Sequence, residues 1–279
     1  MNFLTKQKKI LSLIIFIATS SFSQTSTEKD FTLKFLPSKH IAPLFTANST
    51  EHRITLSKIF EVNKFIGGMG GRFPLALATY KGIKGQLAIA STGYAHLRRT
   101  PGHLQVETID FFVDLYADIV FNKEWTIRSG FGHTSHHFVD DAFEILGYEN
   151  SVNYVRDYLK IFVLKNVDIL NGFLYVGAYY NYHFVIDKPT KNKMIYELGC
   201  EVLNTNLTNA IILYLALDIK IHGELHYGTT QNYQIGLKVG EEFGHTFRLA
   251  YNYRAGLQEQ GQFYNQRVIW NTIGLYFDF

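Results

Sequence analysis

The sequence has 279 residues, with 27 Lys and Arg against 24 Asp and Glu, one cysteine and 15 % aromatic residues. Three of the basic residues, Lys6, Lys8 and Lys9, lie close to the N-terminus, and without them the two signs of charge are equal in number. This balance argues against a nucleic-acid-binding protein, which carries a basic patch or stripe. The lone Cys200 excludes a framework of intrachain disulfides.

The N-terminal segment has the parts of an export signal. The basic residues precede an apolar stretch from Ile10 to Ala18, and the small residues Ser21 and Ser23 follow it. The apolar stretch is too short to span a bilayer as a helix. We therefore expect a signal peptide over residues 1–23, with cleavage near Ser23, and an exported mature protein.

The rest of the chain consists of strand-length segments in which apolar and polar residues alternate. In "YLALDIKI", for example, one face is aliphatic: Leu215, Leu217, Ile219 and Ile221. The other face includes Asp218 and Lys220. No apolar run after the signal approaches the roughly 18 residues of a transmembrane helix. The alternation fits a transmembrane β-barrel or a half-buried soluble sheet.

The C-terminal segment distinguishes these two folds. It ends in "VIWNTIGLYFDF", in which the polar Thr272 precedes Gly274, and Phe277 and Phe279 complete the pattern. This spacing resembles the β-signal by which the barrel-assembly machinery recognises the last strand of outer-membrane proteins. We therefore expect the machinery to be a partner during biogenesis and the bacterial outer membrane to be the location.

The predicted fold class is all-β: a closed antiparallel transmembrane β-barrel of about 12 strands over residues 52–279. Residues 24–51 are expected to form a periplasmic lead-in, with one extra short strand at "FTLKFL" as an option. The candidate strands begin near residues 53, 64 or 72, 84, 107, 124, 154, 173, 193, 212, 232, 246 and 268. An even number is expected of a bacterial single-chain barrel.

Connection lengths predict the orientation of the barrel. If both chain ends are periplasmic, the turns at residues 81–83 and 122–124 are periplasmic, and the longer connections at 139–152 and 257–267 are extracellular. The segment "YRAGLQEQGQFYNQR" near the end is then either an extracellular hairpin tip or a loop that closes over the barrel mouth.

The segment "GHTSHHFVDD" at residues 132–141 lies at the extracellular end of one strand. Alternation from Trp125 places Arg128 in the lumen and Phe131 against lipid, so that His133 and Ser135 project outward. Residues i and i+2 on one strand face lie roughly 7 Å apart, which lets an imidazole reach a hydroxyl.

This His-x-Ser pair, with Asn153 on the same outward face of the next strand, resembles the outer-membrane phospholipase A family. The resemblance implies a twelve-stranded barrel that hydrolyses lipid acyl esters, with Ser135 as nucleophile, His133 as general base and Asn153 orienting the imidazole. The chain departs from the family in having His136 and His137 after the serine, where the family has Asn-Gly, and in a longer loop before Asn153. Asp157 is a polar exception on the outward face, which requires a β-bulge or a polar contact.

Asp140 and Asp141 follow the pair in the chain. Their carboxylates are ligands that Ca²⁺ prefers, and the phospholipase family uses Ca²⁺, so they are the candidate metal ligands. A solvated acidic loop is the alternative explanation of the same residues.

Two classes of function remain open. The first is hydrolysis of a membrane lipid of the outer leaflet, either a phospholipid or lipid A. The second is a non-enzymatic barrel, either a narrow pore or a structural or partner-binding protein. The residues expected in the lumen mix both signs of charge, as in a lumen filled by salt bridges: Arg128, Arg156, Lys160, Asp218 and Lys220. No nucleic-acid partner is expected, and monomer and homodimer both stay open.

Overall fold

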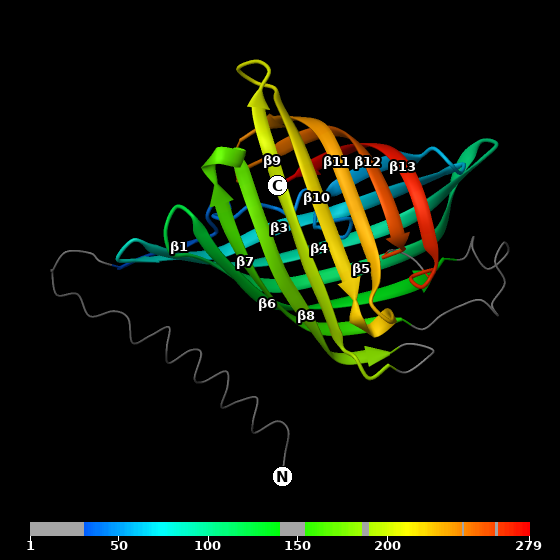
Figure 1. The fold of residues 1–279 in the computed structure, drawn as a ribbon, viewed down its shortest axis with the longest axis horizontal. Coiled ribbons are helices and arrows are strands. Elements are labelled where there is room, and N and C mark those ends of the chain that lie inside the picture. The colour runs from blue at the N-terminus through cyan, green and yellow to red at the C-terminus, as the bar shows by residue number, and fades with distance from the viewer. Residues whose placement is uncertain (1–30, 140–153, 186–189, 242, 260–261) are drawn as a thin grey trace, which may run out of the picture.

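The computed structural model describes residues 31–139, 154–185, 190–241, 243–259 and 262–279, and Figure 1 shows the fold. Within these ranges thirteen strands form one antiparallel sheet that closes on itself. No helix among the described residues has the length and apolar content needed to cross a membrane.

Apart from the first, the strands follow one another in chain order around the barrel. The strands are β1 (Phe31–Phe35), β2 (Ile54–Ile59), β3 (Lys64–Tyr80), β4 (Ile83–Thr100), β5 (His103–Val120), β6 (Trp125–Phe138), β7 (Val155–Val167), β8 (Gly172–Val185), β9 (Met194–Asn206), β10 (Ile212–His222), β11 (Gly228–Gly240), β12 (Thr246–Leu257) and β13 (Arg267–Asp278). Two short 3₁₀ turns, η2 (Asp168–Leu170) and η3 (Gly223–Leu225), lie between strands.

The barrel closes between its last and first strands. β13 pairs with β2, with Phe277 opposite Ile54 and Thr272 opposite Ile59. β2 covers only the first residues of β3, and β1 pairs with the other end of β3, where Phe31 lies opposite Tyr80. Strands β2 to β13 therefore form the closed ring, and β1 is an additional strand outside it.

The predicted all-β barrel of about 12 strands is confirmed. The twelve strands of the ring begin within a few residues of the expected positions, and the optional strand at "FTLKFL" is β1. In β10, Asp218 and Lys220 are buried in the lumen, whereas Leu217 faces outward. Alternation along one strand was sufficient for this result because successive side chains point to opposite faces of the sheet.

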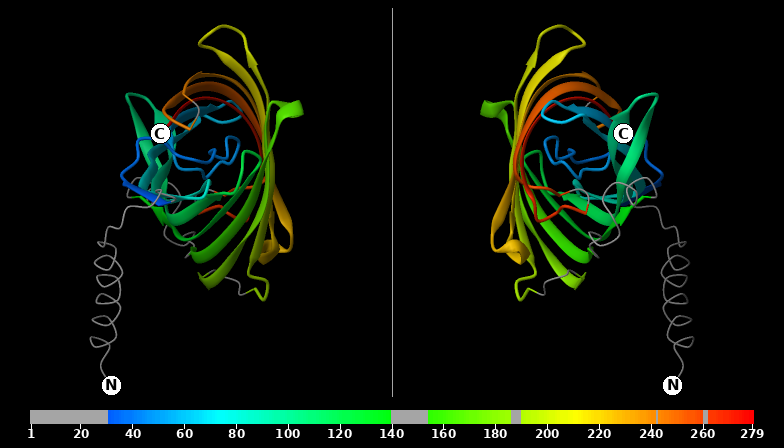
Figure 2. Two further views of the ribbon diagram at one scale, coloured as in Figure 1. Left: turned by 90° about the vertical axis from the view of Figure 1, so that its left-hand side faces the viewer. Right: turned by 90° about the vertical axis from the view of Figure 1, so that its right-hand side faces the viewer.

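Residues 37–53, which we call the lumenal segment, run through the interior of the barrel. Figure 2 shows this part of the chain, in blue, within the ring of strands. The buried Arg53 guanidinium organises it by donating hydrogen bonds to the carbonyl oxygens of Phe45, Thr46 and Asn48 at 2.8 to 3.0 Å. The domain boundaries at residues 23 and 51 stay predictions, but residues 37–51 of the expected periplasmic lead-in lie inside the barrel.

Polar contacts attach the lumenal segment to the barrel wall. Asn48 Nδ2 donates to Glu197 Oε1 of β9 at 3.0 Å, and Lys220 Nζ of β10 donates to Asn48 Oδ1 at 3.1 Å. Arg128 Nη2 of β6 donates to the Pro43 carbonyl at 3.0 Å. Buried polar groups are costly unless hydrogen-bonded, so the polar lumen and the lumenal segment satisfy each other.

The connection between β12 and β13 extends into the barrel mouth. Gln262 Nε2 donates to the His136 carbonyl at 2.7 Å, and the Tyr264 ring stacks on Tyr154 at 4.1 Å. Both side chains are buried. Of the two alternatives for "YRAGLQEQGQFYNQR", the described residues support a loop that closes over the mouth.

Candidate functional site

β6 presents two different sets of polar side chains on its two faces. Thr134 and His136 are buried in the lumen, whereas His133 is exposed and Ser135 partly exposed on the outer face. The outward positions on β6 toward the strand middle carry Phe131 and Ile127. The predicted outward projection of His133 and Ser135, at the end of β6 that leads into the long connection, is therefore observed.

Asp157 of β7 lies directly opposite His133 in the antiparallel register. His133 Nδ1 and Asp157 Oδ1 are 2.6 Å apart, with side-chain exposures of 46 % and 27 %. A ring nitrogen that faces a carboxylate carries the proton when the imidazole is neutral. His133 Nε2 is then the nitrogen free to accept a proton from another group.

Ser135 follows two residues later on the same outward face of β6. Its neighbours across the sheet are Phe111 of β5 and Val155 of β7. Among the described residues, Ser135 Oγ makes no hydrogen bond to the His133 ring. Catalytic hydrogen bonds are often long before substrate binds and tighten in the complex, and the i to i+2 spacing keeps the two groups within reach of rotamer changes.

The second oxygen of Asp157 is also occupied. His183 Nδ1 of β8 lies 2.8 Å from Asp157 Oδ2, so one carboxylate joins two imidazoles from the strands on either side of it. The polar contact expected for Asp157 is therefore present, whereas the bulge lies in the neighbouring β8 and not at Asp157. His183 was not identified, because its facing depends on an irregularity in β8 that alternation does not reveal.

Apolar side chains surround this cluster on the outer wall. Phe111 and Val113 on β5, Phe131 on β6 and Leu159 on β7 are exposed on the outer face. In the membrane such residues face lipid. A Ser, two His and an Asp therefore lie at a lipid-facing position where a charge is costly unless it has partners.

Asn153, Asp140 and Asp141 all lie outside the described residues, so their predicted roles stay predictions. Within the described ranges no three His, Cys, Asp or Glu side chains are grouped so as to hold a metal ion. The imidazole partner that the structure does describe is Asp157.

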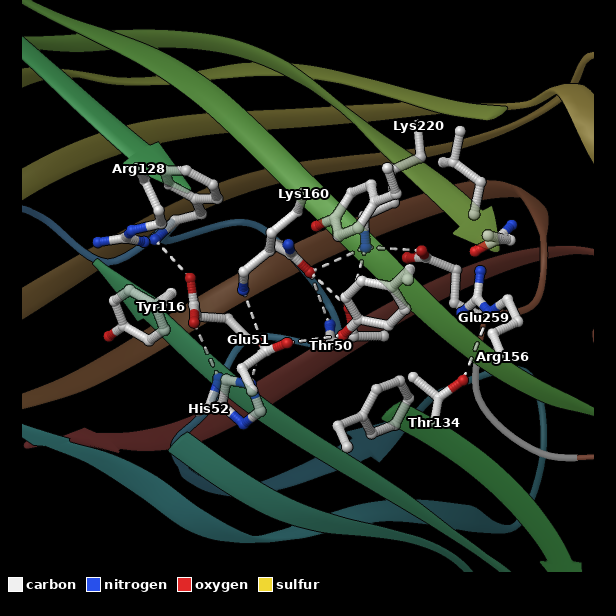
Figure 3. Close-up of a pocket in the computed structure, with 18 residues that line it drawn as sticks. Thr50, Glu51, His52, Tyr116, Arg128, Thr134, Arg156, Lys160, Lys220 and Glu259 are labelled. Atoms are coloured by element: carbon white, nitrogen blue, oxygen red, sulfur yellow. Dashed lines mark hydrogen bonds and ion pairs between the residues drawn. The ribbon is translucent and has the colours of Figure 1, made fainter. Parts of the chain in front are cut away.

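The lumen contains a second cluster of charged groups, shown in Figure 3. Asp114 of β5 lies 2.8 Å from His52 Nε2 and 2.6 Å from Lys160 Nζ, around a cavity of about 40 Å³. Burial alone would raise the pKa of Glu51 in the lumenal segment, but the positive charges of Arg72 and Arg128 outweigh burial and lower it to about 2. All four cations predicted for the lumen form ion pairs: Arg128, Arg156, Lys160 and Lys220. The predicted Asp218 accepts a hydrogen bond from Tyr175 Oη.

Comparisons with known proteins give a likeness of structure only. No protein-family model and no curated protein sequence matches the chain. The outer membrane phospholipase of Salmonella typhi, solved as a dimer with bound calcium, aligns over 82 % of this chain and 90 % of its own at 12 % identity and a TM-score of 0.50.

Outer membrane phospholipase A from Escherichia coli gives the same TM-score of 0.50 at 11 % identity, over 82 % of this chain and 92 % of its own. An active-site mutant of the Escherichia coli enzyme aligns over 86 % and 93 % at 13 % identity, with a TM-score of 0.50. Likeness at such identities concerns the fold. The chain is therefore an outer-membrane β-barrel whose fold is similar to that of outer membrane phospholipase A.

Proposed function

We propose that this protein hydrolyses acyl esters of membrane lipids on the outer wall of its barrel. Ser135 acts as nucleophile, His133 as general base and Asp157 as the residue that orients the imidazole. The observation that carries the proposal is the 2.6 Å contact between His133 Nδ1 and Asp157 Oδ1. His133 lies two residues before Ser135, on the same outward face of β6. A base held by a third group and close to a hydroxyl is the arrangement that activates a serine.

The reaction proceeds in two halves. Ser135 Oγ attacks the ester carbonyl while His133 Nε2 takes its proton, and Asp157 stabilises the resulting imidazolium. The tetrahedral intermediate collapses, the imidazolium donates its proton to the leaving alkoxide, and the lysolipid departs. A water molecule then attacks the acyl-serine with His133 again as base, which releases the fatty acid and restores Ser135.

The position of the cluster indicates where the substrate comes from. Its side chains face away from the lumen, among apolar residues, so the ester must arrive from the membrane rather than from water. The cluster lies at the end of β6 expected to be extracellular, which points to a lipid of the outer leaflet. Exposed Phe111 and Val113 on β5 offer an apolar surface for an acyl chain. Phospholipid and lipid A both carry suitable esters.

The proposal includes Ca²⁺ bound by Asp140 and Asp141. They follow Ser135 closely in the sequence and provide oxygen ligands of the kind that Ca²⁺ binds. A cation held there would supply positive charge for the oxyanion that develops during attack by Ser135. Chelation with EDTA should then lower the rate of hydrolysis, and added Ca²⁺ should restore it.

Partners of the protein are the lipid itself and, during biogenesis, the barrel-assembly machinery. The machinery would recognise the end of β13, so deletion of residues 277–279 should impair insertion into the outer membrane. The similar Salmonella typhi structure is a dimer, and we include a homodimer of this chain in the proposal, to be measured by analytical ultracentrifugation in detergent.

The non-enzymatic barrel is the competing hypothesis. A pore needs a continuous water path, whereas the described lumen is occupied by the lumenal segment and by ion pairs around a cavity with room for a few waters. Incubation of refolded protein with fluorescent diacyl phospholipid, with lipid A and with a fluorophosphonate probe tests the choice. We expect ester hydrolysis and labelling of Ser135. If the protein hydrolyses no ester lipid and Ser135 is not labelled, the non-enzymatic barrel is the remaining hypothesis.

A further inference from the structure

A β-bulge in β8 determines which way His183 points. In the pairing of β7 with β8, Tyr158 lies opposite Asn181, and the preceding Asp157 lies opposite His183. Tyr182 is thus an extra residue with no partner in the register. Under strict alternation His183 would share the lumenal face of the fully buried Asn181. With the bulge, His183 lies on the outer face next to Asp157.

Bulges of this kind are frequent beside functional sites, where they redirect a side chain. The residue redirected here is the one that contacts Asp157 Oδ2 at 2.8 Å. The strand regains its alternation immediately, because Phe184 packs edge-to-face on the buried Tyr154 at 5.7 Å. The irregularity therefore changes the facing of the strand at one point, and its visible consequence is the contact between His183 and Asp157.

The second imidazole supplies what the Asp157 carboxylate lacks. A carboxylate has two oxygens, and His133 occupies only Oδ1. The neighbours of Asp157 on the outward face of β7 are Val155 and Leu159, which offer no hydrogen bond. A carboxylate with an unpaired oxygen among apolar side chains would lose its charge or its orientation. His183 satisfies this oxygen with an N–H donor.

We propose that His183 is a positioning residue that holds the Asp157 carboxylate ionised and aligned on His133. This inference rests on the proposed function. His183 acts through Asp157 rather than on the substrate, because β8 lies two strands away from β6, on the order of 10 Å. The site is then a chain of four residues, Ser135, His133, Asp157 and His183, across three neighbouring strands.

Two substitutions at one position separate positioning from simple filling of space. His183→Ala removes the donor, whereas His183→Asn keeps an amide N–H near the place of Nδ1. We expect His183→Ala to lower kcat for phospholipid hydrolysis by about tenfold with KM unchanged. His183→Asn should restore most of kcat. His103→Asn, at an exposed histidine of the β4–β5 hairpin, is the control and should match the wild type.

The rate of fluorophosphonate labelling of Ser135 is measured on the same proteins, together with heat-modifiable mobility in SDS gels as the check of folding. We expect the labelling rate to follow kcat. If the wild type is active through Ser135 but folded His183→Ala keeps full kcat, or if Asn is no better than Ala, the role of His183 is wrong and the proposed function stands. If wild-type Ser135 neither reacts with the probe nor hydrolyses lipid, both proposals fail.

Discussion

Two histidine–aspartate pairs lie on opposite sides of the barrel wall and differ in their surroundings. In the lumen His52 and Asp114 are 2.8 Å apart, with side chains only 4 % and 5 % exposed, and Asp114 also contacts Lys160 and Tyr158. On the outer wall His133 and Asp157 are 2.6 Å apart and are 46 % and 27 % exposed.

The difference shows how the same two residue types can serve structure or chemistry. The lumenal aspartate has three protein partners and no access for a lipid, so its pair stabilises the filled lumen. The outer pair has one imidazole nitrogen free beside a serine and lies where lipid can reach it. We therefore expect substitutions in the outer pair to change activity and substitutions in the lumenal pair to change stability.

The largest expected effect is on catalysis through the outer pair. Ser135→Ala and His133→Ala should each lower ester hydrolysis by roughly a thousandfold or more, because nucleophile and base act as one unit. For the same reason the double variant should be no less active than either single variant. Hydrolysis rates in mixed micelles provide the measurement. Undiminished activity of Ser135→Ala would contradict the assignment.

The second effect compares Asp157 with Asn153. Asp157→Ala should reduce kcat by about 100-fold or more, since the imidazole loses the group that fixes its tautomer and stabilises its charge. Asn153→Ala should be milder, about tenfold or less. Steady-state kinetics of the two variants gives the comparison. A larger loss for Asn153→Ala would return the orienting role to Asn153.

The third effect lies in the lumen and concerns stability. Asp114→Ala leaves Lys160 buried without its partner and should lower the free energy of unfolding by about 3–5 kcal/mol. The activity of the molecules that remain folded should be unchanged. Urea unfolding in lipid vesicles, monitored by tryptophan fluorescence, measures the free energy of unfolding. Hydrolysis per folded barrel measures the activity. A loss of activity without loss of stability would place the lumenal pair in the catalytic machinery.

The fourth prediction tests which side chains of the barrel wall face the lipid. Leu217→Arg puts a charge on the lipid face at the middle of β10 and should cost about 2–4 kcal/mol in urea unfolding. Leu217→Ile, which keeps the aliphatic surface, is the matched control. Full stability of Leu217→Arg would mean that this part of β10 does not face the bilayer interior.

The smallest effect is the response of the lumenal segment to acid. The pKa of Glu51 is lowered from its ordinary value of 4.5 to about 2, so its ionised form stabilises the fold above pH 4.5. This contribution should decrease as the pH falls from 4.5 towards 2. Glu51→Gln should reduce the acid sensitivity of the urea midpoint over that range. An unchanged pH profile in the variant would show that other carboxylates dominate.

The sequence by itself determined the barrel, the facing of its strands and the outward position of His133 and Ser135. These features depend on a period of two residues along single strands, and that period is visible in "YLALDIKI" and in the residues from Trp125 to Ser135. A lumen containing Arg128 and Lys220 was predictable for the same reason, because charged residues are buried only where partners are available.

Only the tertiary structure decided which side chains meet across strands. Asp157 lies opposite His133 because of the register between β6 and β7, which alternation along a single strand does not specify. His183 joins them through a bulge at Tyr182, which breaks the alternation used to predict facing. The position of the lumenal segment inside the barrel also depends on tertiary contacts, because its polar groups pair with side chains on strands distant in the sequence. Such long-range pairing leaves no periodic pattern in the sequence.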